Sequence, residues 1–378
     1  MKRNFSLLFV LVSLMAFAQI EEKKLDELIQ NTLKTFDVPG MSVGIIKDGK
    51  MVYAKGFGIN SLTTKQKMDE NTLVGIASNS KGFTGTALAM LADEGKLNFD
   101  DKVTKFIPEF RMYDPYVTQE ITVKDLITHR AGLGLGQGDL MFFPEGGNLT
   151  VNDIIHNVRY LKPEHSFRNT MDYNNIMFIV AGEVIKRVSG LSWAEFIEQR
   201  ILKPVGMKSS FGNYNRAKAA GVKNIIDAHA PVDGKVIQVP HDWNETADAA
   251  GGIISNITDM GIWADFLMNG FTTKDGKKLV SDKQIQQLWN VQIATPVALK
   301  NSYDSNFGGY GLGWFLTDVK GHKQVYHTGG LIGTVTQFTL IPDMKLGIIV
   351  LTNQQSGAAF STVTNTVKDA YLGIEDRN

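Results

Sequence analysis

The sequence has 378 residues, in which 39 lysines and arginines balance 39 aspartates and glutamates to give a formal net charge of zero. This balance offers no positive surface for nucleic acid, so we expect no nucleic-acid partner. The chain is 43% apolar, as in ordinary globular proteins, and its lack of cysteine excludes disulfides and thiolate metal sites.

The first 18 residues have the pattern of a signal peptide. Lys2 and Arg3 precede an apolar run over residues 5–17, and Ala16-Phe17-Ala18 offers a small-x-small cleavage site. The run is shorter than the roughly 20 residues that a membrane span needs. We therefore expect an exported protein, periplasmic or secreted, with no membrane span after cleavage and a single domain over residues 19–378.

The N-terminal part of the mature chain predicts a helix followed by a hairpin. Apolar residues recur at helical spacing over residues 21–36, which predicts an amphipathic helix. Two β-prone runs, residues 42–47 and 50–55, flank Asp48-Gly49, a strong signal for a two-residue hairpin turn.

The next predicted helix begins near Ser78, runs through Leu91 and ends at Gly95. Ser78 and Lys81 are three residues apart and so share one face of this helix. A serine hydroxyl becomes a good nucleophile when an adjacent amine takes its proton, and a helix N-terminus favours a developing oxyanion. The alternative is that Ser78 is only an N-cap residue, for which serine is common.

Helices and loops are predicted from residue 122 to residue 290. Capping boxes begin helices at Thr122 and at Ser192, the second ending before Pro204. Three other helices are predicted: one over residues 174–188, one after Ser255 that ends near Met268, and one that begins at Ser281. Residues 205–250 are predicted to be rich in loops.

The C-terminal third changes to strand-like runs, at residues 310–316, 324–327, 333–341 and 346–351, before a final helix over residues 358–371. Strands at both ends of the chain predict an α/β (α+β) fold. One antiparallel sheet is built from residues of about 19–75 and 250–378 and is flanked by helices, with a mostly helical region of about 76–249 inserted.

Two further motifs accompany the Ser-x-x-Lys pair. Tyr173-x-Asn175 lies at the start of an apolar helix, and His327-Thr328-Gly329 lies at the edge of a strand pair, where glycine permits close approach of a ligand. Each motif alone has an ordinary structural explanation, such as a helix-entry tyrosine with its hydroxyl in water or a strand-edge histidine with satisfied hydrogen bonds.

Together the three motifs resemble the serine β-lactamase and penicillin-binding-protein family, in particular the class C β-lactamase-like branch of esterases, D-aminopeptidases and DD-peptidases. The resemblance covers most of residues 38–353 and extends to residues 39–43, 93–97, 125–133, 250–255 and 310–314.

The resemblance implies catalytic roles. Ser78 is the expected acylated nucleophile, Lys81 its base partner, and Tyr173 a proton relay to the leaving group and later to water. The backbone N–H groups of Ser78 and Gly330 are expected to form the oxyanion hole. Which of Lys81 and Tyr173 is the base in each half-reaction stays open, because coupled groups titrate as a pair.

The resemblance also implies substrate-binding roles. Asn175 is expected to hold the amide or carbonyl of the substrate, and His327, Thr328, Gly329 and Gly330 to line its strand side. True class C β-lactamases carry Lys-Thr-Gly at this place, where a permanent cation receives the carboxylate of the antibiotic. Because histidine is mostly neutral at pH 7, His327 favours an esterase or D-peptidase over a β-lactamase.

The sequence thus predicts an exported serine hydrolase that forms an acyl-enzyme on an ester, a D-amino-acyl amide or a peptidoglycan-type peptide, without cofactor or metal. A β-lactamase proper and an inert sensor of cell-wall peptides are the alternatives. A metallohydrolase fits poorly, because the seven histidines form no His-x-x-x-His pair.

The signal peptide gives the first prediction. Export should remove residues 1–18, so intact-mass analysis of the exported protein should give the mass of residues 19–378. A mass that still contains the first 18 residues would show that the segment is an anchor or part of the fold.

Overall fold

The computed structural model describes residues 20–144, 147–241 and 244–374, so the predicted signal peptide lies outside the described residues. Fourteen α-helices are found in the described chain: α1 Glu22–Thr35, α2 Ser80–Asp93, α3 Val103–Phe106, α4 Pro115–Glu120, α5 Val123–Leu126, α6 Val151–Asn157, α7 Ile176–Ser189, α8 Trp193–Ile197, α9 Lys203–Val205, α10 Tyr214–Ala219, α11 Asp248–Gly251, α12 Ile257–Met268, α13 Asp282–Leu288 and α14 Gly357–Leu372. No helix in this described part is both long and apolar enough to cross a membrane.

The strands are β1 Gly40–Lys47, β2 Lys50–Gly58, β3 Val74–Gly75, β4 Ala228–Val232, β5 Lys235–Val239, β6 Ile254–Ser255, β7 Ile293–Ala294, β8 Gly308–Tyr310, β9 Phe315–Val319, β10 His322–Leu331, β11 Thr334–Ile341 and β12 Leu346–Thr352. Eight of them form one antiparallel sheet in the order β2-β1-β12-β11-β10-β9-β8-β7. The N-terminal hairpin therefore joins the C-terminal strands through the β1–β12 pair, which confirms the predicted sheet built from both ends of the chain.

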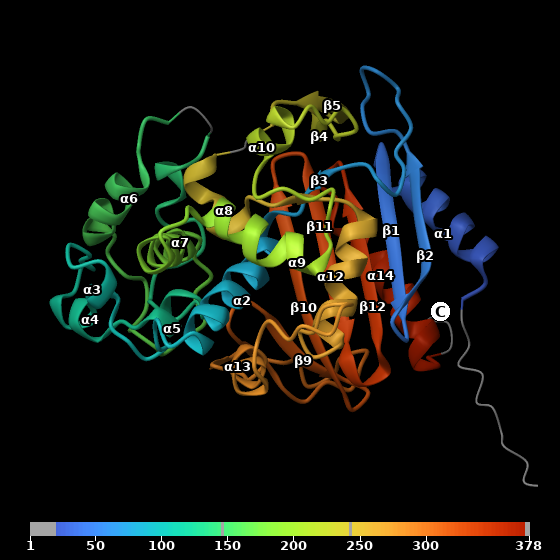
Figure 1. Cartoon of the computed structure of the whole chain (residues 1–378). Helices are drawn as coiled ribbons and strands as arrows, with labels where there is room; N and C mark the ends of the chain where they lie inside the picture. The colour runs from blue at the N-terminus through green and yellow to red at the C-terminus, as the bar shows by residue number, and fades with distance from the viewer. Residues whose placement is uncertain (1–19, 145–146, 242–243, 375–378) are drawn as a thin grey trace, which may run out of the picture.

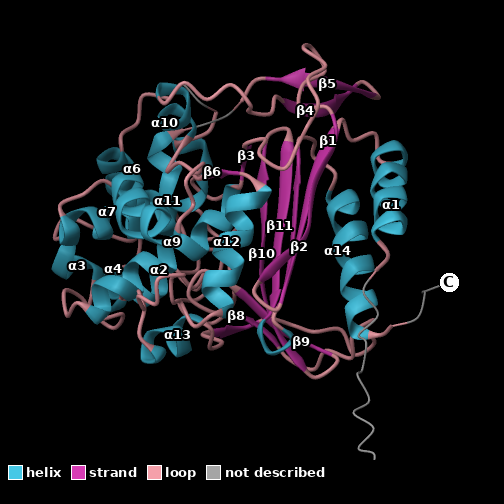
Figure 2. Cartoon of the chain, turned by 45° about the vertical axis from the view of Figure 1, so that its right-hand side comes forward, coloured by secondary structure: helices cyan, strands magenta, loops and turns pink. Residues whose placement is uncertain are grey.

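Helices cover both faces of this sheet (Figures 1 and 2). The terminal helices α1 and α14 pack together on one face, and α12 packs on β1 and β12 from the other, towards the helical region that contains α2 and α7. Strand β12 is buried on both sides, because Ile348 and Val350 join the core under α14 whereas Ile349 and Leu351 join the core of the helical side. This two-sided burial explains why β12 reads as a continuous apolar run.

Most predicted elements are confirmed. The helix at 22–35, the hairpin around Asp48-Gly49, the capping boxes at Thr122 and Ser192, and the last helix all form as expected. The end of the Ser192 helix was predicted wrongly, because helical turns continue through Pro204 to Gly206. Pro204 lies within the first two positions of α9, where its missing N–H costs little.

Two other predictions are corrected. The predicted strand over 310–316 is broken into β8 and β9, because Gly313 adopts a left-handed φ of +88° and packs against the backbone of Lys81. The stretch 205–250 is less irregular than expected, since it contains α10 and a hairpin of β4 and β5. Its turn is formed by Asp233 and Gly234, both with positive φ.

The sheet and the helical region meet at the turn that precedes α2. Thr336 of β11 donates a hydrogen bond to the carbonyl of Ile76 (3.0 Å) and accepts one from the Asn79 amide (2.8 Å). A Cβ added to Gly329 of β10 would lie 2.3 Å from the same carbonyl, so only glycine allows β10 to come this close. These contacts fix the position of Ser78 relative to the sheet.

Candidate active site

Ser78 lies in a single 3₁₀ turn, Ala77–Asn79, directly ahead of α2. Ala77 has a positive φ of +50°, an uncommon conformation for a residue with a side chain, and such strain clusters at functional sites. No side-chain capping bond forms at the start of this turn or of α2. The alternative role of Ser78 as a mere N-cap residue therefore has no support in the geometry.

Lys81 is completely buried one turn further along α2. Its Nζ lies 3.0 Å from Ser78 Oγ, 2.8 Å from Asn175 Oδ1 and 2.8 Å from the backbone oxygen of Ala250. Burial lowers the pKa of Lys81 to about 7, an effect that the Asp139 carboxylate partly opposes. A large fraction of Lys81 is therefore a neutral amine at pH 7.

The three contacts of Lys81 match the hydrogen-bonding capacity of a neutral amine. The oxygens of Asn175 and Ala250 can only accept, so they take its two N–H groups. The third position of Nζ faces Ser78 Oγ: a protonated Lys81 donates a hydrogen bond there, and in the neutral amine a lone pair takes that place, as a general base needs.

The phenol of Tyr173 lies beside this pair. Lys81 Nζ is 5.0 Å from the centre of the Tyr173 ring. The ring of the buried His129 packs against the same phenol, with the two ring centroids 4.1 Å apart. Burial raises the pKa of Tyr173 above its ordinary value, while a hydrogen bond with Ser78 opposes the rise. Tyr173 therefore stays a protonated phenol at neutral pH.

His129 was not predicted as part of the site. Its Nδ1 accepts the backbone N–H of Asn174 at 3.1 Å, so the proton of the neutral ring lies on Nε2. Burial lowers the pKa of His129 well below its ordinary value, and nearby Lys81 and His327 add to this effect.

His327 lies on β10, as the sequence led us to expect, but its side chain is buried. Its Nε2 accepts from the Tyr310 hydroxyl at 3.0 Å, and its Nδ1 donates to the backbone oxygen of Thr328 at 2.6 Å. Burial, with a contribution from Lys81, lowers the pKa of His327 to about 3. The ring is therefore neutral at physiological pH.

The end of β10 is open on one side. Strand β9 pairs with β10 only as far as Tyr326, so residues from His327 to Leu331 keep a strand partner on the β11 side alone. Gly330 is exposed and lines the same cavity as Ser78. The predicted position of this motif at a strand edge is thus found in the structure.

Asn175 connects Lys81 to an acidic residue that sequence reasoning missed. Its Nδ2 donates to Asp139 Oδ2 at 3.0 Å, which directs its Oδ1 towards Lys81. Burial raises the pKa of Asp139, and hydrogen bonding to Asn175 opposes this. Asp139 begins a single 3₁₀ turn, Asp139–Met141, and no local pattern in the sequence marked it.

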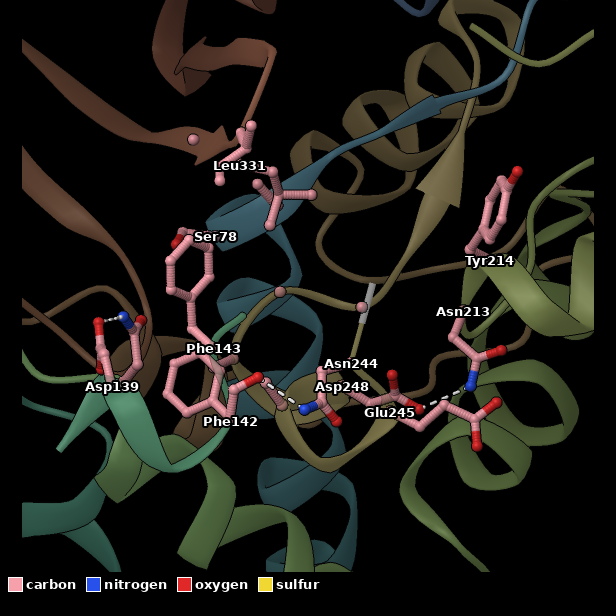
Figure 3. Close-up of a pocket in the computed structure, with 18 of the residues that line it drawn as sticks. Ser78, Asp139, Phe142, Phe143, Asn213, Tyr214, Asn244, Glu245, Asp248 and Leu331 are labelled. Atoms are coloured by element: carbon pink, nitrogen blue, oxygen red, sulfur yellow. Dashed lines mark hydrogen bonds between the residues drawn. The ribbon is translucent and has the colours of Figure 1, made fainter. Parts of the chain in front are cut away.

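A cavity of about 360 Å³ opens onto Ser78 (Figure 3). Its walls come from the Ser78 turn, Asn175, the end of β10, α11, the start of α10 at residues 213–215, and the segments 139–143 and 244–247. The backbone oxygen of Ala250 in α11 is a functional group without any side-chain signature in the sequence. In the part of the chain that the structure describes, no group of three or more His, Asp or Glu side chains is arranged to hold a metal ion.

Curated relatives of known name match most of this chain. The unguisins hydrolase ungD' of Aspergillus campestris is 27% identical over 86% of this chain and 60% of its own length. Protein flp of Staphylococcus aureus is 28% identical over 89% of this chain and 64% of its own length. The chain thus spans less than two thirds of the length of each of these relatives.

Solved structures share the fold. The octameric penicillin-binding protein homologue from Pyrococcus abyssi superposes with a TM-score of 0.78 at 28% identity, covering 93% of this chain and 77% of that one. SurE superposes with a TM-score of 0.73 at 19% identity, covering 94% of this chain and 77% of the SurE chain, which shows a common fold. The family model described as Beta-lactamase matches residues 25–372, so the chain belongs to the β-lactamase and penicillin-binding-protein superfamily of serine hydrolases.

Proposed function

We propose that this protein is an exported serine hydrolase that acts through an acyl-enzyme on Ser78. The observation that carries the proposal is the 3.0 Å contact between Ser78 Oγ and the buried amine of Lys81, whose two other neighbours can only accept hydrogen bonds. Export rests on the signal-peptide pattern of residues 1–18.

In the acylation step, neutral Lys81 takes the proton of Ser78 while Oγ attacks the carbonyl carbon of the substrate. The carbonyl oxygen becomes an oxyanion, for which the backbone N–H groups of Ser78 and Gly330 are the proposed donors. Collapse of this intermediate breaks the bond to the leaving group, which takes a proton from the phenol of Tyr173. Proton transfer from Lys81 then restores the phenol.

Deacylation reverses the proton movements. Lys81, acting directly or through Tyr173, takes a proton from a water molecule while the water oxygen attacks the carbonyl carbon of the acyl group. The proton then returns to Ser78 Oγ as the ester bond to the serine breaks. At neutral pH the raised pKa keeps Tyr173 protonated, whereas the lowered pKa leaves neutral Lys81 available, so Lys81 is the proposed base. The phenol acts as a relay because it lies against both groups.

The proposed substrates are esters, D-amino-acyl amides and peptidoglycan-type peptides, with β-lactam hydrolysis as the minor alternative. A neutral, buried His327 offers no cation for a substrate carboxylate. One relative is named a hydrolase of unguisins, which agrees with a hydrolytic function. The inert-sensor alternative is weaker, because Ser78, Lys81 and Tyr173 are all present and in contact.

Substitution of the nucleophile tests the proposal. Ser78→Ala should lower kcat for p-nitrophenyl acetate at least about a thousandfold, since no neighbouring group can form the acyl bond. Thermal unfolding should change little, because Ser78 makes no capping bond. Ser361→Ala in α14, on the far face of the sheet, is the matched control and should keep full activity. Full activity in Ser78→Ala would refute the acyl-enzyme.

A second prediction concerns His327. His327→Lys should improve kcat/KM for carboxylate-bearing substrates relative to neutral esters by on the order of 1 kcal/mol, because it places a cation where a neutral ring now lies. His327→Gln, which stays neutral, should not. Comparison of a cephalosporin with p-nitrophenyl acetate measures the ratio. If the wild type turns over the cephalosporin faster than the ester, the role given to His327 is wrong.

A further inference from the structure

His129 is a buried titratable residue to which the proposed mechanism gives no role. It follows α5, and its side chain is only 1% exposed. Its backbone φ of +54° lies in the left-handed region, which is uncommon for a residue with a side chain. Backbone strain of this kind is typical of functional sites.

Both chain neighbours of Tyr173 are bound by His129. The backbone oxygen of His129 accepts the N–H of Asp172 at 2.7 Å, and its Nδ1 accepts the N–H of Asn174 at 3.1 Å. The carbonyl and the side chain of one residue thus reach the same short segment. The backbone on each side of Tyr173 is therefore fixed by His129.

The ring of His129 also packs on the phenol. Its centroid lies 4.1 Å from that of Tyr173, and the two ring planes make an angle of 31°. The Nε2 of His129 has no hydrogen-bond partner among the described residues, and the rings of Tyr310 and Phe178 lie 4.5 and 5.2 Å away, centroid to centroid. A buried N–H without a partner costs free energy. The contacts with the Tyr173 segment explain why a histidine is kept here despite that cost.

The segment that carries His129 is itself firmly anchored. The fully buried carboxylate of Asp125 accepts from Arg130 at 2.6 Å and from Arg168 at 2.6 and 3.0 Å. The backbone N–H of Arg168 also donates to the backbone oxygen of Arg130 at 2.8 Å. His129 therefore holds Tyr173 from a rigid base.

We propose that His129 is a positioning residue, which holds the phenol of Tyr173 in line with the leaving group during acylation. The inference rests on the proposed function, in which this phenol protonates the leaving group while Lys81 takes the proton of Ser78. A proton donor works only within hydrogen-bond distance of the departing atom. Loss of the His129 contacts should therefore slow the reaction most where the leaving group needs a proton most.

Two esters with the same acyl group test this inference, p-nitrophenyl acetate and p-methoxyphenyl acetate. The p-nitrophenolate is a weak base that leaves without a proton, whereas the more basic p-methoxyphenolate gains from protonation. Because kcat/KM covers only the steps up to release of the phenol, deacylation does not affect it. The kcat/KM of the p-methoxyphenyl ester divided by that of the p-nitrophenyl ester, here called the ester ratio, reports the proton donor. A loss of folded protein lowers both rates equally and leaves the ester ratio unchanged.

Two variants separate the contacts of His129. His129→Asn keeps an acceptor near the place of Nδ1 and suits the left-handed φ, but it removes the ring beside Tyr173. His129→Phe keeps a ring but leaves the N–H of Asn174 without its acceptor. Each should lower the ester ratio about tenfold, since a positioned general acid contributes a factor of about 100 or more.

Two further variants assign the effect to the phenol. Tyr173→Phe should lower the ester ratio at least as far, and adding His129→Asn to it should lower the ratio no further, because no phenol is left to position. The matched control is His229→Asn on β4, since His229 is also buried and its Nε2 also accepts a backbone N–H, that of Leu62 at 3.1 Å. This control should keep the wild-type ester ratio.

Three outcomes would overturn the inference: wild-type ester ratios in both His129 variants, a wild-type ratio in Tyr173→Phe, or a further tenfold fall when His129→Asn is added to Tyr173→Phe. Each would leave the acyl-enzyme standing as long as Ser78→Ala is inactive on both esters. Activity of Ser78→Ala equal to that of the wild type would instead refute the proposed function.

Discussion

The burial of a single amine, that of Lys81, is the constraint on which the site depends. An ammonium group removed from water loses its hydration, so the protein favours the neutral form and the pKa falls to about 7. The Asp139 carboxylate opposes this shift only in part. The carbonyl-type oxygens of Asn175 and Ala250 can take the two protons of the neutral amine. Burial therefore prepares Lys81 to receive the proton of Ser78.

The fold provides this environment by bringing together segments that are far apart in the sequence. The start of α2 carries Ser78 and Lys81, the start of α7 carries Asn175, α11 supplies the oxygen of Ala250 and β10 closes the far side. The close approach of β10 depends on Gly329, which leaves no room for a side chain. The sheet built from both chain ends is therefore what encloses the amine.

Local signals explain what the sequence predicted well. The Asp48-Gly49 hairpin, the capping boxes and the Ser-x-x-Lys spacing are short-range patterns whose geometry the backbone determines by itself. Parts of the site without such a pattern were missed. Ala250 acts through a backbone oxygen, and Asp139 comes from a single 3₁₀ turn. The break between β8 and β9 was hidden because Gly313 turns in response to its packing against Lys81.

The most direct test of the account is the pH dependence of covalent labelling at Ser78. A fluorophosphonate needs the proton of the serine removed and releases fluoride, so its rate reports the base in the acylation step. The account predicts that the labelling rate, with the adduct mapped to Ser78, increases with pH and levels off above an inflection near pH 7, where Lys81 becomes neutral. Two results would contradict the account. One is a labelling rate that stays constant from about pH 5 to about pH 9, and the other is a rate that rises only near the ordinary pKa of lysine.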